Sequence, residues 1–224
     1  MLRKNLTKAI IPLTNHLIYK NLLSNHSNKL IIASGPAGTG KTMLATQQAI
    51  NDLKNKKIER VILTRPTVGA DEDIGFLPGS LEEKMAPWVR PIYDVFLENY
   101  KKVQLEKMIK NEIIEIAPLA FMRGRTFKNS FIIADELQNT SINQMKMLLT
   151  RIGEGSRMVA TGDIEQTDVE GTSGLEHFLD LLMVCPEMDD IRYVVMGRED
   201  IRRSEVVEKV LRMYGMDEEE GHYV

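Results

Sequence analysis

Gly35-Pro-Ala-Gly-Thr-Gly-Lys-Thr42 is the stretch of sequence that decides the fold, because it matches the phosphate-loop pattern G-x-x-x-x-G-K-[ST]. The apolar run Lys29–Ser34 before it predicts a buried strand, and the residues from Lys41 to Leu53 after it predict a helix. A strand, a glycine-rich turn and a helix in this order form the context that a phosphate loop requires. A chance glycine-rich turn is the weaker interpretation, so the sequence predicts a site for the phosphate chain of a nucleotide.

Each residue type in this stretch suits phosphate binding. The glycines at 35, 38 and 40 let the backbone curl so that successive N–H groups point at phosphate oxygens, and the following helix adds the positive end of its dipole. Lys41 is expected to neutralise the β- and γ-phosphates, and the Thr42 hydroxyl is expected to bind Mg²⁺. The predicted ligands are ATP and Mg²⁺, and the predicted nucleotide contacts are Gly35, Pro36, Ala37, Gly38, Thr39, Gly40, Lys41 and Thr42.

Short β-rich runs alternate with helical patterns along the rest of the chain. This alternation predicts a single α/β domain with a mostly parallel central sheet that is flanked by helices. A helix is also predicted over Ser80–Tyr100, interrupted at Pro87 and Pro91, because proline lacks the N–H that a helix interior needs. The other predicted strands are Arg60–Thr64, Glu112–Ile116, Ser130–Ala134, Arg157–Thr161 and Ile191–Met196, and the other predicted helices lie near Ser141–Arg151, Ser173–Met183 and Ser204–Tyr214.

Two adjacent carboxylates follow another predicted strand. Phe131–Ala134 is apolar throughout, and Asp135 and Glu136 come directly after it. An aspartate at the carboxyl end of such a strand can hold the Mg²⁺ shell beside a phosphate loop, so Asp135 joins Thr42 in the predicted metal site. Glu136 can orient a water molecule and deprotonate it for attack on the γ-phosphate. A small-molecule kinase that uses the same loop does not need this second carboxylate, whereas a hydrolase does.

The order of these motifs along the chain resembles that of the PhoH-like proteins, phosphate-loop ATPases related to superfamily 1 helicases. The resemblance runs from about residue 14 to residue 214, and it implies a RecA-like fold that hydrolyses ATP. It is carried by Gly35–Thr42, Leu63–Pro66, Gly75–Gly79, Ala117–Thr126, Asp135–Asn139, Gln144–Met147, Thr150–Gly153, Thr161–Asp163 and Gln166.

The resemblance also implies roles that the residue pattern alone does not give. It implies that Gln166 senses the γ-phosphate, and that Gln138 couples the nucleotide state to movement. Because one RecA-like lobe lacks the opposite wall of its site, the expected assembly is a homo-oligomeric ring, a hexamer in this family, with RNA or single-stranded DNA as the nucleic-acid partner. The box Glu199–Val207 is expected to supply an arginine finger, for which the candidates in order are Arg203, Arg202 and, from another motif, Arg151.

The segment before the phosphate loop departs from the family pattern. Family members usually carry a glutamine that reads the adenine edge in a Thr-x-Gln-x-x-Tyr setting, and here Thr14–Tyr19 places His16 at that position. An imidazole can stack on adenine or hydrogen-bond to it, but it offers fewer bonds than an amide. A half-exposed helix histidine without a ligand is an equally good interpretation of His16.

Composition excludes several classes of protein. The chain has 224 residues, 43% of them hydrophobic, and a net charge of −3, which rules out a disordered polyelectrolyte. No apolar run approaches the ~18 residues of a membrane helix, and the single cysteine, Cys185, fits a reducing cytoplasm. Residues 1–51 carry six basic and no acidic side chains, so a transit peptide is the lesser alternative to a cationic phosphate site.

The expected organisation is a segment on the adenine side over 1–28, an ATPase domain over 29–214 and an acidic tail over 215–224. The leading function is Mg²⁺-dependent ATP hydrolysis that is coupled to RNA or single-stranded DNA. The alternative is a nucleotide-gated switch whose hydrolysis only resets a protein or RNA interaction. Three interpretations remain open for Arg65, Arg123 and Arg125. They contact a phosphate backbone, contact a neighbouring subunit or pair with a local acid.

Overall fold

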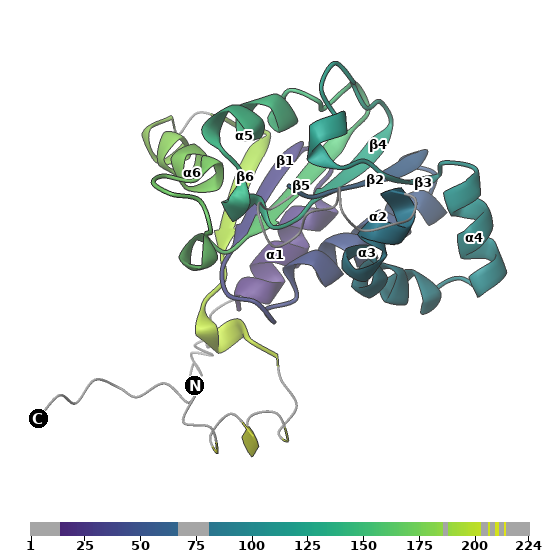
Figure 1. The fold of residues 1–224 in the computed structure, drawn as a ribbon, viewed down its shortest axis with the longest axis horizontal. Helices are drawn as coiled ribbons and strands as arrows, with labels where there is room; N and C mark the ends of the chain where they lie inside the picture. The colour runs from purple at the N-terminus through teal and green to yellow at the C-terminus, as the bar shows by residue number, and fades with distance from the viewer. Residues whose placement is uncertain are drawn as a thin grey trace, which may run out of the picture.

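One sheet of six strands forms the centre of the computed structural model, which describes residues 14–66, 81–185 and 188–202 and the single residues 206, 209, 210 and 213. The strand order is β3-β2-β4-β5-β1-β6, and every strand pair in it is parallel (Figure 1). The predicted single α/β domain with a central sheet flanked by helices is confirmed, and its sheet is wholly rather than mostly parallel among these residues. The strands are β1 Leu30–Ser34, β2 Arg60–Thr64, β3 Ile114–Ile116, β4 Ser130–Ala134, β5 Arg157–Gly162 and β6 Ile191–Val195.

Helices cover both faces of the sheet and bury its strands on two sides. Alternate residues of a strand point to opposite faces, so Ile31 and Ala33 of β1 join one hydrophobic cluster, and Leu30 and Ile32 join the other. This burial on two sides explains why the strands read as continuous apolar runs. The first cluster packs against α1 Asn15–Ser24, α2 Lys41–Lys54, α3 Leu81–Leu97 and α4 Lys102–Lys110, and the second packs against α5 Ile142–Leu149 and α6 Gly174–Val184 (Figure 1).

Helix α3 runs through Pro87 and Pro91, so the predicted interruption at these residues is wrong. Each proline removes one N–H from the helix, at a cost of about 3 kcal/mol in a helix interior. Both prolines are exposed, whereas Val89, Ile92 and Phe96 of the same helix are buried in the first cluster. Burial of these side chains outweighs the local cost, because each contributes roughly 1.5–3 kcal/mol when it is fully buried.

Gly35 lies where β1 and β6 come together at the start of the phosphate loop. A Cβ atom built on it would lie 2.2 Å from the carbonyl oxygen of Met196, and its φ of +139° is rarely adopted by other residues. Gly35→Ala is therefore expected to lower the free energy of unfolding by about 2–4 kcal/mol, measured by urea denaturation. Gly171→Ala is the matched control, because Gly171 also has a positive φ but no atom within 4 Å of its built Cβ. A loss no larger than in this control would contradict the steric explanation.

Candidate functional site

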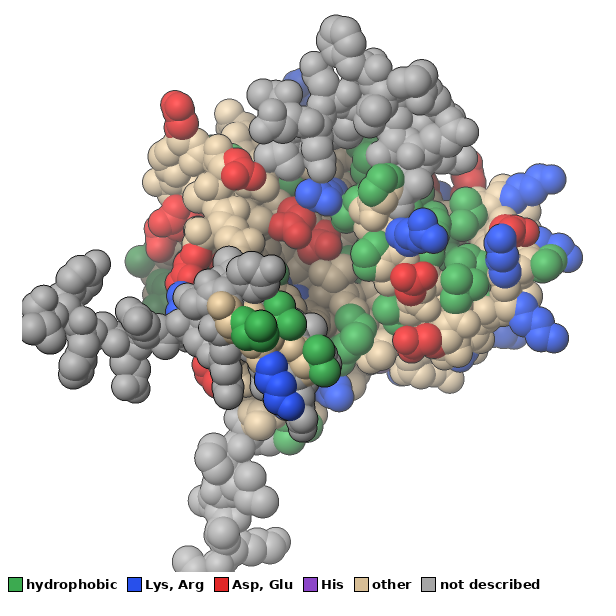
Figure 2. Space-filling model, turned by 60° about the horizontal axis from the view of Figure 1, so that its bottom comes forward, with side chains coloured by type: hydrophobic (Ala, Val, Ile, Leu, Met, Phe, Trp, Pro, Cys, Tyr) green, Lys and Arg blue, Asp and Glu red, His purple; other side chains and the backbone are tan. Residues whose placement is uncertain are grey.

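A cleft of about 260 Å³ opens at the carboxyl ends of three adjacent strands. In the sheet, β5 lies between β4 and β1, so the residues that follow these strands meet at one edge. Figure 2 shows acidic side chains gathered in the hollow at the centre of the molecule. The cleft is lined by Ala37, Gly38, Gly40, Lys41, Thr42, Met43, Asp135, Glu136, Gly162, Asp163 and Gln166. The fold therefore brings most of the predicted site residues together.

Lys41 is the first residue of α2, and its ammonium group turns back into the phosphate loop. Its Nζ donates hydrogen bonds to the carbonyl oxygens of Gly35 at 2.5 Å and Pro36 at 2.8 Å, and to Thr39 Oγ1 at 3.2 Å. Burial lowers the pKa of Lys41, and the carboxylates of the cleft act against this lowering because they favour the charged form. A cation is thus held at the base of the loop, where it suits an anionic ligand.

Thr42 and Asp135 are 93 positions apart in the chain but lie side by side, because Thr42 Oγ1 donates a hydrogen bond to Asp135 Oδ1 at 3.0 Å. Thr161 Oγ1 of β5 donates to the same carboxylate oxygen. Oxygen atoms from α2, from β5 and from the residue after β4 therefore lie together, and oxygen ligands are those that Mg²⁺ prefers. No three His, Cys, Asp or Glu side chains cluster as metal ligands among the described residues, so an ion here would need further ligands from phosphate and water.

Glu136 has a left-handed backbone conformation, with φ of 56° and ψ of 39°. Such a conformation costs about 1 kcal/mol or more in a residue other than glycine, so the surrounding contacts must hold it. The backbone N–H of Glu136 donates to Asp135 Oδ1 at 3.1 Å, and its carboxylate oxygen Oε2 accepts from Gln138 Nε2 at 2.6 Å. The predicted base is therefore fixed in the cleft, next to the predicted metal ligand.

Gln138 is only 2% exposed and joins two sides of the cleft. Its amide nitrogen donates to Glu136, and its Oε1 accepts from the backbone N–H of Asp163 at 3.1 Å. Its main-chain oxygen accepts from Thr167 Oγ1 at 2.9 Å. A Cβ atom on Gly162 would lie 2.8 Å from Gln138 Oε1, so the glycine before Asp163 leaves room for this link.

Asp163 is a cleft residue for which the sequence predicted no role of its own. Its side chain is 5% exposed, and its Oδ1 accepts from the backbone N–H of Glu165 in the short helix η3 Ile164–Gln166. Gln166 ends this helix and lines the cleft with an exposed side chain. The signal that could have revealed Asp163 is its place just after an apolar strand, which matches the place of Asp135 after β4.

His16 lies on α1 and contacts the phosphate loop from outside the cleft. Its Nε2 is 3.0 Å from the carbonyl oxygen of Thr39, and its Nδ1 is 3.4 Å from Oδ1 of Asp200. No sequence pattern pointed to Asp200, which lies 185 positions from its hydrogen-bond partner Asn15. The contact of His16 with adenine stays a prediction.

The arginine-finger candidates differ in their positions. Arg203 and the motif Gly75–Gly79 lie outside the described residues. Arg202 is exposed, and its backbone N–H donates to the carbonyl oxygen of Gly38 at 3.1 Å, so it lies beside the phosphate loop of its own chain. Arg151 donates three hydrogen bonds to oxygen atoms of its own chain, so its guanidinium group is already engaged.

The three loop arginines also differ. Arg125 forms an ion pair with Glu115 of β3, which agrees with the interpretation that this arginine pairs with a local acid. Burial raises the pKa of Glu115, but Arg125 and Arg60 together hold it below its usual range. Arg123 is exposed and has no partner among the described residues, and Arg65 has a buried Nε without a hydrogen-bond partner there.

A family model described as PhoH-like protein matches residues 12–215. The chain is 46% identical over 189 residues to a PhoH-like protein of Bacillus subtilis, covering 84% of this chain and 58% of that protein. It is 44% identical over 197 residues to a PhoH-like protein of Mycobacterium tuberculosis, with 87% and 55% covered, and 43% identical over 192 residues to Protein PhoH of Escherichia coli, with 84% and 53% covered. The chain thus spans about half the length of the curated relatives it matches.

Two solved helicase structures are also similar. The Hef helicase domain of Pyrococcus furiosus has a TM-score of 0.45 and 14% identity, with 84% of this chain and 38% of that chain covered. The Pif1 helicase of Candida albicans has a TM-score of 0.41 and 22% identity, with 90% and 42% covered.

Proposed function

The chain belongs to the PhoH-like protein family, and we propose that it is an Mg²⁺-dependent ATPase whose turnover is coupled to RNA or single-stranded DNA. One observation carries the ATPase proposal: Lys41, Thr42, Asp135 and Glu136 line one cleft, with the side-chain oxygens of Thr42 and Asp135 3.0 Å apart. A phosphate-binding cation, two metal ligands and a carboxylate that can activate water are the groups that hydrolysis needs. A site that only bound phosphate would not need the carboxylate.

In this proposal each residue has one task in hydrolysis. Lys41 and the backbone N–H groups of the loop hold the β- and γ-phosphates. Bound Mg²⁺ would supply charge neutralisation and orientation of the phosphate chain. Glu136 accepts a proton from water as the water oxygen bonds to the γ-phosphorus, and the bond from this phosphorus to the bridging oxygen breaks, which yields ADP and inorganic phosphate. Gln166, at the cleft surface, senses whether the γ-phosphate is present.

Removal of the metal tests this proposal directly. Phosphate release from ATP is expected to stop completely in EDTA and to return when excess Mg²⁺ is added, because Thr42 and Asp135 hold phosphate only through the ion. Release is measured with the same protein before chelation, after chelation and after Mg²⁺ addition. Hydrolysis that continues in EDTA, once contaminating phosphatases are excluded, would count against the metal site.

The proposal includes partners and a location. We place the protein in the cytoplasm as a homo-oligomeric ring, a hexamer, in which an arginine of the neighbouring subunit reaches the γ-phosphate. The candidates for this arginine remain Arg203, Arg202 and Arg151. The single cysteine, Cys185, is free and exposed, which supports a reducing compartment. Across the parts of the chain that the structure describes, no helix combines the length and the apolar character needed to cross a membrane.

The alternative proposal is a nucleotide-gated switch. The buried link from Glu136 through Gln138 to Asp163 favours it, because this link offers a route from the nucleotide to the loop after β5. Turnover with and without RNA and single-stranded DNA separates the two proposals. Coupling predicts that nucleic acid raises the rate several-fold, whereas a switch predicts an unchanged rate with nucleotide-dependent binding of its partner. The mass in solution, measured on the same samples, tests the ring.

A further inference from the structure

Polar side chains from distant parts of the chain meet beside the phosphate loop. Asp200 is 4% exposed, and its Oδ2 accepts a hydrogen bond from Asn15 Nδ2 at 2.7 Å. Its other oxygen, Oδ1, lies 3.4 Å from Nδ1 of His16. The remaining ring nitrogen of His16, Nε2, lies 3.0 Å from the carbonyl oxygen of Thr39. We call Asn15, His16 and Asp200 the loop clamp.

Hydrogen-bond chemistry determines which atom of the loop clamp donates to the phosphate loop. A carbonyl oxygen only accepts, so Nε2 of His16 must donate to Thr39. Nδ1 of His16 lies within ion-pair distance of Asp200 Oδ1 and makes no hydrogen bond among the described residues. The backbone N–H of Gly197 donates to Asp200 Oδ2 at 3.0 Å, so this oxygen of the nearly buried carboxylate accepts two hydrogen bonds. Such compensation is what a carboxylate needs when it is removed from water.

Two further contacts hold the loop from the same two directions. One helical turn after His16 in α1, the buried hydroxyl of Tyr19 donates to the carbonyl oxygen of Lys41 at 3.1 Å. On the other side, the backbone N–H of Arg202 donates to the carbonyl oxygen of Gly38 at 3.1 Å. The phosphate loop is therefore fastened both to α1 and to the segment that follows β6.

We propose that His16 and Asp200 are positioning residues for the phosphate loop, and that the loop clamp selects the triphosphate chain of the substrate rather than its base. This inference rests on the proposed ATPase function. Nε2 of His16 and the amide nitrogen of Asn15 make their hydrogen bonds inside the clamp, so these donors are engaged away from a base edge. The clamp acts on the ligand through Thr39, a residue of the loop itself. The substrate class it selects is nucleoside triphosphates without regard to the base.

The test compares ligands that share a triphosphate chain and differ in the base: ATP, GTP and inorganic tripolyphosphate. His16→Ala is expected to raise KM for ATP and for GTP by the same factor, about fivefold to tenfold, while kcat changes by less than about twofold. The affinity for tripolyphosphate in Mg²⁺, measured by isothermal titration calorimetry, is expected to fall by that same factor. A group that acts on the loop must affect all three ligands, because all three present the same phosphates to it.

Two more variants separate positioning from general packing. His16→Gln is expected to keep KM for GTP and the affinity for tripolyphosphate within about threefold of the parent, because an amide can donate to the Thr39 carbonyl. Asp200→Asn keeps the shape of the side chain and removes its charge, so it is expected to raise KM for ATP and GTP together. Rescue by glutamine would not follow from a side chain that only fills space.

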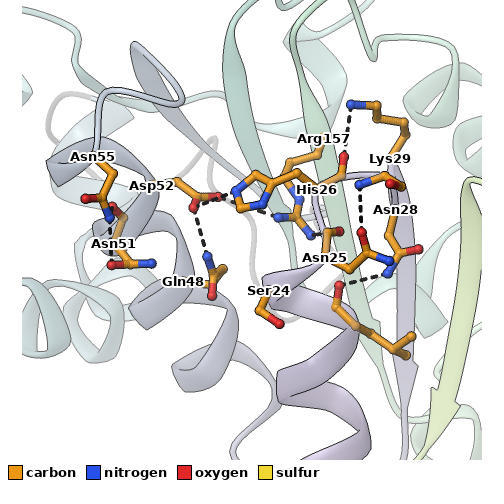
Figure 3. A network of polar contacts seen from close by, with 12 residues as sticks. Ser24, Asn25, His26, Asn28, Lys29, Gln48, Asn51, Asp52, Asn55 and Arg157 are labelled. Carbon is orange, nitrogen blue, oxygen red and sulfur yellow. Dashed lines mark hydrogen bonds and ion pairs between the residues drawn. The ribbon is translucent and has the colours of Figure 1, made fainter.

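The matched control is His26, which makes the same kind of contact at the opposite edge of the sheet. Its Nε2 lies 3.0 Å from Oδ1 of the fully buried Asp52, in a network that includes Gln48 and Arg157 (Figure 3). His26→Ala therefore removes a histidine–aspartate contact without touching the loop. It is expected to lower the thermal unfolding midpoint and to leave KM for every nucleotide at the parent value.

The outcomes that overturn the inference are distinct. A rise in KM that is confined to ATP would mean that His16 reads adenine. If the His16→Ala and His16→Gln proteins lose affinity for the ligands equally, the bond to Thr39 is not what connects His16 to the loop. If His26→Ala raises KM by the same factor, destabilisation alone is responsible. If the parent binds ATP and tripolyphosphate but releases no phosphate, only the ATPase proposal fails, and the calorimetric comparison still tests the loop clamp.

Discussion

Glu136→Gln is expected to leave ATP bound while phosphate release falls by about a hundredfold or more, the usual scale for the loss of a general base. The amide keeps the size of the carboxylate, and its oxygen can still accept the hydrogen bond that Gln138 now donates at 2.6 Å. It cannot take a proton from water. The contacts that Lys41 and Thr42 would make to the phosphates are unchanged, so the affinity for ATP is expected to stay within about threefold of the parent.

Binding and chemistry are measured separately for this variant. Equilibrium binding of a fluorescent ATP analogue gives the affinity, and single-turnover phosphate release gives the rate of hydrolysis. Glu170→Gln is the control, because Glu170 is exposed and does not line the cleft, and it is expected to hydrolyse ATP at the parent rate. If Glu136→Gln also hydrolyses at the parent rate, the base must be another group, and Asp163, buried in the same cleft, becomes the carboxylate to test.

The part of the site that depends on local sequence could be predicted. The glycine spacing of the phosphate loop and the apolar runs that became β2 and β4 are local signals, and the predicted bounds Arg60–Thr64 and Ser130–Ala134 match those strands. The meeting of Thr42 and Asp135 followed from one further rule, that the carboxyl ends of parallel strands share an edge. The binding of Mg²⁺ between them stays a prediction.

Helix α4 was not predicted, although Leu105, Met108 and Ile109 recur at helical spacing and pack in or against the first cluster. The other missed features depend on contacts that no local pattern contains. The contact between Asn15 and Asp200 joins positions 185 apart, and no motif links them. The hydrogen bond from Gln138 to the predicted base depends on the left-handed backbone conformation of Glu136. Neighbouring contacts impose this conformation, which residues other than glycine disfavour.

Lys41→Ala is expected to raise the Kd for ATP by about a hundredfold or more. The ammonium group has three donors, and in the structure they are directed at oxygen atoms inside the loop. Hydrogen bonds to charged groups contribute roughly 1.5–3 kcal/mol each, and a loss of about 2.8 kcal/mol already weakens binding a hundredfold. Hydrolysis is expected to disappear with binding, in contrast to Glu136→Gln, where binding persists.

Loss of binding in Lys41→Ala should not arise from unfolding, and the environment of the lysine gives the reason. Burial lowers the pKa of Lys41, which means that the folded protein holds this charge at a cost, so its removal relieves a desolvation penalty. The thermal unfolding midpoint is therefore expected to stay close to that of the parent. Lys128→Ala, which removes an exposed lysine at the amino end of β4, is the control and is expected to bind ATP as the parent does. A Lys41→Ala protein that binds ATP with the parent's Kd would place the triphosphate outside this loop, and the proposed roles of Thr42, Asp135 and Glu136 would fall with it.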